Sequence, residues 1–239
     1  MRRTVFVTGS SRGIGLEIAR QFVKTGDCVV LNGRTDAEQL ELAVKELQAA
    51  TGILADMSDY VQAQAAFGQI VKRFGPVEVL VNNAGMAHFG LFTDMTPDNW
   101  EDVLRHNFFH VLNATHLAVP GMVSAKSGVI INISSVWGVE GASCEAVYAA
   151  AKGAVNAFTR SIAKELGPSG VRVCAVACGA IETRMNANLS PEERASLTEA
   201  IPLMRFGTAE EVGKLVKFLA SDDAAYLTGQ VIGLDGGGL

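Results

Sequence analysis

Short apolar runs alternate along the whole chain with longer segments in which apolar residues recur at helical spacing. The apolar runs end at Gly, Asn, Asp or Ser, which is typical of strands that lead into turns. The predicted strands are 4–8, 28–32, 53–55, 77–81, 128–135, 171–177 and 230–234. A helix is predicted directly after Gly15, and further helices at 37–48, 60–74, 97 to about 119, 148 to about 166, 189–200 and 209–220.

Strict alternation of strand and helix predicts an α/β fold in which a parallel sheet has right-handed crossovers and helices on both faces. We expect a single Rossmann-type, doubly wound domain over residues 1–239, with about seven strands. In such sheets the ligands bind beyond the carboxyl ends of the strands. The residues that follow each strand are therefore the first candidates for a functional site.

Composition and charge narrow the class of protein. The chain has 239 residues, of which 19% are charged, and a formal net charge of −5. An acidic balance argues against a broad surface for nucleic acid or anionic membrane, because both need clustered Lys and Arg. No signal peptide or membrane-spanning run is found, so a cytoplasmic location is expected by default. The four cysteines form no C-x-x-C pair and are interpreted as reduced.

A glycine-rich turn follows the first strand. Gly9, Gly13 and Gly15 allow backbone amides to approach a pyrophosphate at the positive end of the following helix. The spacing is G-x-x-x-G-x-G, which differs from the G-x-G-x-x-G of longer dehydrogenases. We predict a dinucleotide site here, and its remaining members are Ser11, Arg12 and Ile14.

The second strand ends at Gly33 and Arg34. In this fold a carboxylate at that place would accept the ribose 2′-hydroxyl of NAD, whereas an arginine suits a 2′-phosphate. Arg34, helped by Arg12, therefore favours NADPH/NADP over NAD. The alternative interpretation is that Arg34 is a solvated loop charge.

Polar and small residues follow the next two strands. Asp56 is a candidate acceptor for the adenine amino group, and Ser58 or Asp59 is expected to cap the helix that begins at Tyr60. The run Asn82-Asn83-Ala84-Gly85 suits a close backbone approach to the cofactor and hydrogen bonds between neighbouring strand ends.

Tyr148 and Lys152 lie one helical turn apart, so their side chains share one face. An unperturbed tyrosine titrates near pH 10, and a neighbouring ammonium is expected to lower its pKa. Taken alone, the spacing is weak evidence, and a solvated helix face is the more common reason for such a pair. His106 and His110 also lie four apart, but no third ligand type accompanies them, so no metal site is predicted and both are interpreted as structural or exposed.

These motifs together resemble one family. Thr8-Gly9-x-x-x-Gly13-Ile14-Gly15, Asn82-Asn83-Ala84-Gly85, Asn107, Ser135 and Tyr148-x-x-x-Lys152 occur in the order and contexts of the short-chain dehydrogenase/reductase superfamily. The resemblance extends to the tail at Thr228-Gly229-Gln230 and Asp235-Gly236-Gly237. Within the superfamily the chain most resembles the bacterial 3-oxoacyl-acyl-carrier-protein reductases.

The resemblance implies catalytic roles for four residues. Tyr148 would protonate the carbonyl oxygen, Lys152 would lower the pKa of Tyr148 and hold the nicotinamide ribose, Ser135 would donate to the substrate oxygen, and Asn107 would position a relay water. The cofactor-binding residues that it implies are Gly9, Ser11, Arg12, Gly13, Ile14, Gly15, Arg34, Asp56, Met57, Asn83, Ala84, Gly85, Tyr148, Lys152, Gly179, Ile181 and Thr183. Ser135, Trp137, Tyr148, His88 and Glu140 are expected to contact substrate.

The expected pocket wall is formed by residues 86–92, 136–140, Cys144 and the stretch 185–203. Two departures from the family pattern stand out. Cys178 replaces the usual proline after the sixth strand, which should loosen the loop there and leaves two interpretations, a buried inert thiol or an oxidisable one. Lys126 matches a place where basic residues would dock an acidic carrier protein beside the pocket, but Ser169 stands where an arginine would help.

The expected function is NADPH-dependent reduction of a 3-oxoacyl group on acyl-carrier protein. One alternative is reduction of another small ketone, a sugar or a steroid by the same site. Another is a non-catalytic dinucleotide-binding regulator, although such a protein would not need Ser135, Tyr148 and Lys152. By analogy with the family, a homotetramer that pairs through the helices of Asn107 and Tyr148 is expected, with no nucleic acid or membrane partner.

Overall fold

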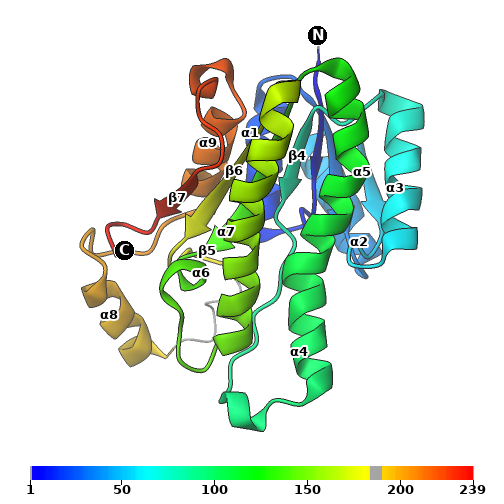
Figure 1. Ribbon diagram of the computed structural model, residues 1–239. Helices are drawn as coiled ribbons and strands as arrows, with labels where there is room; N and C mark the ends of the chain where they lie inside the picture. Colours follow the sequence, from blue (N-terminus) through cyan, green and yellow to red (C-terminus); the bar gives the residue numbers. More distant parts are fainter. Residues whose placement is uncertain (1, 184–189, 239) are drawn as a thin grey trace.

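The computed structural model describes residues 2–183 and 190–238. A seven-stranded parallel sheet runs through it in the order β3-β2-β1-β4-β5-β6-β7 (Figure 1). The strands are β1 Thr4–Val7, β2 Cys28–Gly33, β3 Thr51–Leu54, β4 Val79–Asn82, β5 Gly128–Ser135, β6 Val171–Cys178 and β7 Val231–Leu234. The chain winds outward from β1 in one direction and then from β4 in the other, so a ligand crevice is expected beyond β1 and β4. The predicted fold is confirmed.

Helices cover both faces of this sheet. The helices are α1 Gly13–Lys24, α2 Ala37–Leu47, α3 Tyr60–Phe74, α4 Pro97–Leu104, α5 His110–Ala125, α6 Trp137–Glu140, α7 Ala146–Leu166, α8 Pro191–Ala200 and α9 Ala209–Leu219. In Figure 1 α3, α5 and α7 lie on the near face of the sheet. Helices α1, α2 and α9 pack on the opposite face.

Two hydrophobic cores separate the layers. Successive strand residues point to opposite faces, so Val5 and Val7 join the core under α1, α2 and α9, whereas Phe6 joins the core under α3, α5 and α7. Both faces of each central strand are therefore buried. The burial explains why the strands were recognisable as nearly continuous apolar runs.

Local signals fixed most helix starts. Asp59 caps α3 by accepting from the backbone amide of Gln62, as predicted. Ser190 and Glu193 form a reciprocal capping box at the start of α8, which confirms the start signal there. The predicted helix 189–200 begins in this structure at Pro191, and its first residue lies outside the described residues.

Several predicted bounds differ from the structure by a few residues, and three differences are larger or bear on the site. The helix predicted from residue 97 to about 119 continues to Ala125 and contains a π-helical segment, Arg105–Phe109, between α4 and α5. The short helix α6 directly after β5 was not predicted. Cys178 ends β6 and does not begin a loop, because it pairs with Ser135 and its carbonyl accepts from Val136.

Candidate active site

A cleft of about 400 Å³ opens at the carboxyl ends of the strands. It is lined by every residue predicted to bind cofactor and by all four predicted catalytic residues. These residues come from the turns after β1, β2, β3, β4, β5 and β6, from the π-helical segment and from α7. The parallel sheet brings them together because all its strands end at the same edge.

The glycine turn is held against the end of β4. The hydroxyl of Thr8 accepts from the backbone amides of Asn83 (3.0 Å) and Ala84 (3.1 Å), and the Asn83 side chain donates to the carbonyls of Thr8 and Gly9. A Cβ on Gly9 would lie 2.8 Å from the Cα of Ala84, so no larger residue fits this approach. The predicted hydrogen bonds between neighbouring strand ends are thus confirmed.

Gly13 shows that this turn suits a phosphate group. It lines the cleft with a φ of +58°, and a Cβ built on it would meet nothing within 4 Å. The position is therefore left open to the cleft, at the first turn of α1, where unpaired amides and the helix dipole favour an anion. This arrangement fits a dinucleotide pyrophosphate.

At the far end of the cleft, Arg34 contacts the imidazole of His106. The Nδ1 of His106 is assigned as the donor to the carbonyl of Asp102 at 2.8 Å, which leaves Nε2 to accept from Arg34. Asp56 accepts from the amide and hydroxyl of Ser58, both at 2.8 Å. Burial raises the pKa of Asp56, but the hydrogen bonds from Ser58 and the charges of His106 and Arg34 together outweigh burial, and the net pKa is lowered. Arg34 thus lines the cleft and contacts His106, while its side chain is exposed to solvent.

The candidate catalytic residues lie on β5, on α7 and in the π-helical segment. Ser135 ends β5, accepts from the amide of Trp137 at 3.2 Å and lies next to the phenol of Tyr148, whose pKa it influences. The ammonium of Lys152 lies 5.7 Å from the centre of the Tyr148 ring and donates to the carbonyl of Ile133 at 2.9 Å. The packing of α7 against β5 therefore places Tyr148 beside Ser135, and Lys152 lies one helical turn further along α7.

Electrostatics at this pair differ from the prediction. Burial raises the pKa of Tyr148 to about 12, and the neighbouring Ser135 hydroxyl opposes this rise without reversing it. Burial lowers the pKa of Lys152 to about 8. The net pKa of Tyr148 is therefore not below its usual value, because desolvation of the phenol dominates and the ammonium of Lys152 is directed at Ile133.

Asn107 connects the end of β4 to the helix that crosses it. Its side-chain amide donates to the carbonyls of Met86 (2.7 Å) and Val103 (2.9 Å), and its oxygen accepts from the amide of Met86 (3.3 Å). The side chain is fully buried. It therefore fixes the chain just after Gly85, next to the cleft.

Comparison with known proteins identifies the family. The family model described as short chain dehydrogenase matches residues 3–194. The chain belongs to the short-chain dehydrogenase family. This membership makes it an oxidoreductase that acts on CH–OH and C=O groups with a nicotinamide dinucleotide.

Several relatives match over nearly their full length. The 3-oxoacyl-acyl-carrier-protein reductase FabG of Thermotoga maritima is 38% identical over 98% of this chain and 97% of its own. The enzyme of the same name in Staphylococcus aureus is 40% identical over 99% and 98%. A crystal structure described as a putative gluconate dehydrogenase from Agrobacterium tumefaciens superposes with a TM-score of 0.95 at 29% identity, over 99% of this chain and 95% of that one.

The residues predicted to contact substrate are only partly at the cleft. Ser135 and Tyr148 line it, but Trp137, His88 and Glu140 do not. Trp137 lies near Glu145, and Glu140 is exposed at the end of α6. Trp137 and Glu140 belong to the unpredicted helix α6, whereas His88 lies in the stretch after β4. Of the predicted wall 185–203, the part up to residue 189 lies outside the described residues.

Lys126 and Ser169 were predicted at places beside the pocket. For the pocket of their own chain this prediction was wrong. Both precede the first residues of β5 and β6, whereas the cleft lies where those strands end. Eight strand residues span about 25 Å, at roughly 3.3 Å per residue. Neither residue can therefore flank the cleft of its own chain.

Cys178 lines the cleft as a buried thiol. Burial raises its pKa to about 12, and the nearby charge of Lys152 opposes the rise only in part. A thiol with a raised pKa holds little thiolate at neutral pH and reacts slowly. Of the two interpretations, the inert thiol is the one that this environment favours.

The sequence interpretation missed two histidines of the cleft. His106 contacts Arg34 and lies 3.8 Å from the carboxylate of Asp56, and His110 lines the cleft one turn further along. Their positions one before and three after Asn107 were the available signal, since all three share a helix face. No cluster of metal-ligating side chains includes them among the described residues.

Proposed function

We propose that this protein uses NADPH to reduce a 3-oxoacyl thioester, carried on acyl-carrier protein, to the 3-hydroxyacyl form. The observation that carries the proposal is the joint presence of Ser135, Tyr148 and Lys152 in one cleft with a dinucleotide-type glycine turn. The choice of substrate is supported by the full-length relatives named 3-oxoacyl-acyl-carrier-protein reductase. The identity of the substrate is a more specific proposal than carbonyl reduction, and it has its own test.

The chain's own residues suit the proton side of this reaction. When bound, the nicotinamide supplies the hydride. Tyr148 is protonated at neutral pH, as a tyrosine with an ordinary or a raised pKa is, so it holds the proton that the carbonyl oxygen needs. Ser135 polarises the same oxygen through its hydroxyl. The ammonium of Lys152 stabilises the phenolate that remains on Tyr148.

Arg34 is the residue that we propose to select NADP. Its guanidinium lies at the end of β2, where an arginine fork can pair with a 2′-phosphate. Asp36, the carboxylate nearest along the chain, is already used as the cap of α2 through the amide of Gln39. Arg12, on the other side of the same cleft, adds a second positive charge.

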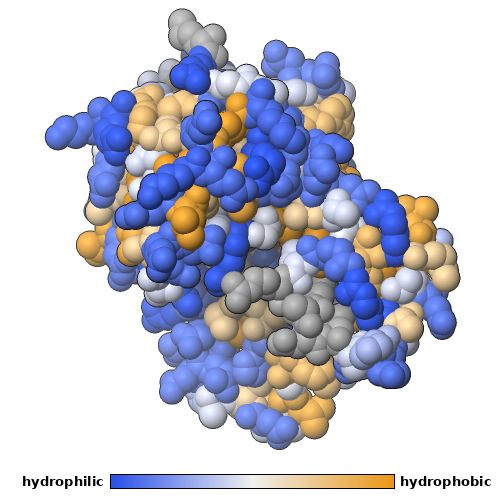
Figure 2. All heavy atoms as spheres, turned by 180° about the vertical axis from the view of Figure 1, so that it is seen from behind, coloured by the Kyte–Doolittle hydropathy of each residue, from blue (hydrophilic) through white to orange (hydrophobic). Residues whose placement is uncertain are grey.

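Exposed apolar residues suit an acyl substrate. Phe89, Leu91 and Phe92 precede α4, are more than half exposed and do not line the cleft, so they suit only an acyl chain that extends beyond it. The amide of Gly90 donates to the carbonyl of Cys144, so this stretch lies against the chain that leads into α7. Figure 2 shows hydrophobic residues interspersed with hydrophilic ones over the rear face of the molecule.

The test is NADPH oxidation, followed by absorbance, with a 3-oxoacyl thioester on carrier protein and with a panel of ketones, sugars and steroids. We expect the thioester to give the highest kcat/KM. Higher turnover of another carbonyl would replace the proposed substrate while leaving carbonyl reduction in place. Tight NADPH binding with no turnover on any carbonyl would instead support a non-catalytic regulator.

The cofactor choice has its own variant. Replacing Arg34 by Ala should raise the Kd for NADPH by about tenfold or more, since a charged hydrogen bond is worth roughly 1.5–3 kcal/mol. The Kd for NADH should change little. Lys45, a basic residue on α2 that does not line the cleft, provides the control as Lys45→Ala. An equal rise in the Kd for NADPH and for NADH would show that Arg34 does not select between the two cofactors.

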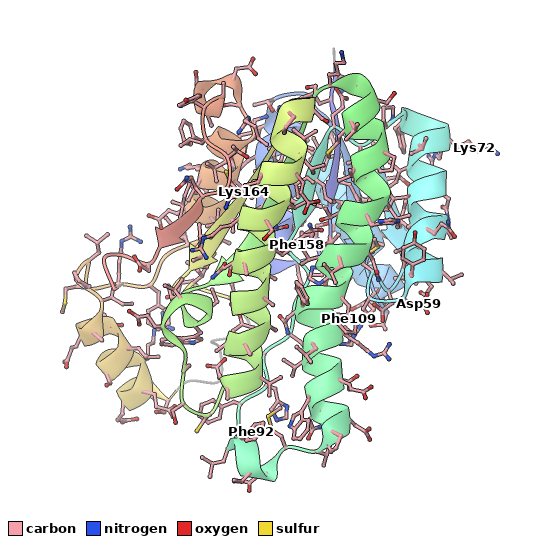
Figure 3. All side chains as sticks on the ribbon, viewed as in Figure 1. Asp59, Lys72, Phe92, Phe109, Phe158 and Lys164 are labelled. Atoms are coloured by element: carbon pink, nitrogen blue, oxygen red, sulfur yellow. The ribbon has the colours of Figure 1, made fainter. Side chains whose placement is uncertain are left out.

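We further propose that copies of the chain pair through the face of α5 and α7. Phe109 is 42% exposed, and Phe108 packs edge-on against Phe158 of α7 with ring centroids 6.2 Å apart. Figure 3 shows Phe109, at the end of the π-helical segment that leads into α5, and Phe158 on α7. Light scattering should give a tetramer, and a monomer would refute the proposal.

A further inference from the structure

His110 is a buried imidazole that the proposed chemistry leaves without a role. It begins α5 directly after the π-helical segment, is 2% exposed and lines the cleft. Neither of its ring nitrogens has a hydrogen-bond partner within residues 2–183 and 190–238. A neutral imidazole has one donor and one acceptor, so both capacities are left for something else in the cleft.

Such a residue is unfavourable for folding unless something satisfies it. Buried polar side chains in native proteins nearly always have a partner, either protein or ordered water. An apolar residue of similar size at position 110 would pack without that penalty. The presence of histidine therefore points to water held in the floor of the cleft, since a buried water typically bridges polar groups that lack other partners.

Burial and the charged groups around His110 together set the protonation state of its imidazole. Lys152 from α7 and His106 from the π-helical segment disfavour a positive charge on the ring, while Asp56 from the chain after β3 favours it. Burial is the largest effect and, with these charges, lowers the pKa of His110 to about 3. The carbonyl of His106 opposes the shift only weakly and is not in hydrogen-bonding geometry. The imidazole is therefore neutral wherever Lys152 titrates.

We propose that His110 is a positioning residue that holds a water chain behind Lys152, along which protons from solvent resupply the site. Three residues on one helical surface, His106, Asn107 and His110, line the cleft together, and π-helical segments of this kind are frequent at functional sites. The inference rests on the carbonyl reduction proposed above. The family resemblance already implies a relay water at Asn107, and the new element is His110 as a residue that holds such water.

The proton balance is simple. Each reduction takes one proton from the Tyr148 hydroxyl and leaves a phenolate. The phenolate regains a proton that originates from the Lys152 ammonium, and the neutral amine takes one from the adjacent water. That water is hydrogen-bonded to a His110 nitrogen, and the resulting hydroxide is neutralised by the next water towards solvent. One solvent proton is consumed per turnover, and His110 itself changes neither charge nor covalent bonding.

Two variants separate this role from packing. His110→Leu keeps a similar volume but removes both nitrogens, and His110→Gln keeps a donor and an acceptor. We expect His110→Leu to lower kcat about tenfold, below the 10²–10⁴ of a direct acid or base, with KM and the NADPH Kd within about twofold. Its Tm should be unchanged or higher, because the unpaired polar group is gone. His110→Gln should retain most of kcat.

A further readout and a matched control sharpen the experiment. The solvent deuterium isotope effect on kcat should rise in His110→Leu, because proton resupply then limits turnover. His116 lies on the same helix but is exposed and outside the cleft, so His116→Leu should leave kcat and the isotope effect unchanged. A normal kcat in His110→Leu, or equal losses in the Leu and Gln variants, would overturn the proposal.

A crystal structure of the wild-type protein gives a test that needs no turnover. We expect an ordered water within hydrogen-bond distance of a His110 nitrogen, absent in His110→Leu. A dry environment around His110 would refute the inference even if the enzyme is active. If the water is present but no carbonyl is reduced, the proposed function fails, and the relay falls with it while the water site stands.

Discussion

Thr8 provides a sharp test of how the cleft is built, because one hydroxyl holds two segments together. Its oxygen accepts from the amides of Asn83 and Ala84 and lies 3.4 Å from the carbonyl of Val81, to which it donates. Thr8 itself is fully buried, while Asn83 and Ala84 are partly buried. Thr8→Val has nearly the same shape but leaves both amides without this acceptor.

The expected loss follows from those two amides. A buried donor left unpaired costs about 1–3 kcal/mol, and partial exposure places each of these near the lower limit, so the total is roughly 2–3 kcal/mol. For a domain of this size that corresponds to a fall in Tm of about 4–12 °C. The freed stretch Asn83–Gly85 lines the cleft, so the Kd for NADPH should rise as well, by about tenfold if roughly 1.4 kcal/mol of the loss is felt there.

Thermal and urea unfolding measure the stability loss, and fluorescence titration measures the cofactor affinity. Thr8→Ser is the control, because it keeps the hydroxyl and loses only a methyl group, at about 1 kcal/mol. We expect Thr8→Ser to be tolerated better than Thr8→Val in both assays. If Thr8→Ser is the more damaging change, packing of the methyl group rather than the hydroxyl holds the two segments together.

Four further outcomes are expected. Tyr148→Phe should bind NADPH within a few-fold of wild type while carbonyl reduction falls about 10²-fold or more; near-normal turnover would show that Tyr148 is not the acid. The rate of reduction should decline as pH rises through about 8, where Lys152 loses its charge, and a rate that stays level there in a pH profile would contradict this. Cys178 should resist a thiol reagent at neutral pH, judged by mass spectrometry, because burial raises its pKa to about 12. Asp27 hydrogen-bonds Arg3 and Lys217, which lower its pKa against the opposing effect of burial; its stabilisation is therefore present above the unfolded pKa near 3.9 and lost as pH falls through the lower folded value. Asp27→Asn should destabilise by about 1–3 kcal/mol at neutral pH in urea unfolding, with a smaller difference in acid.

The sequence predicted the layout of the site because parallel strands impose it. Once the order of strand and helix is known, Gly9, Asn83 and Ser135 must end at the same edge, whatever the details of packing. Helical spacing likewise placed Tyr148 and Lys152 on one face. These inferences use only periodicity and chain direction, which a sequence contains.

The errors arose where tertiary packing decides. A π-helical segment and an α-helix share almost the same apolar period, so Arg105–Phe109 could not be distinguished from its flanks. The place of Trp137 depends on the short helix α6, which no local pattern predicted. The environment of His110 depends on burial under segments distant in sequence, which also explains why it was interpreted as structural.

The same dependence on burial changes how the Tyr148 and Lys152 pair works. Spacing alone suggested that the cation lowers the pKa of the phenol, which would favour the phenolate and hence alcohol oxidation. In the folded chain burial moves the two pKa values to about 12 and about 8, so at neutral pH the phenol is protonated and the amine is mostly charged. That is the protonation state in which a carbonyl oxygen can be protonated and the phenolate then stabilised. An unshifted tyrosine and lysine would carry the same protons at neutral pH, so the pair holds the proton for reduction with or without the shifts. Burial matters instead for the return of the proton, because it leaves Lys152, with a pKa of about 8, as the group that must regain a proton from solvent in each turnover, the step at which a neutral His110 would act.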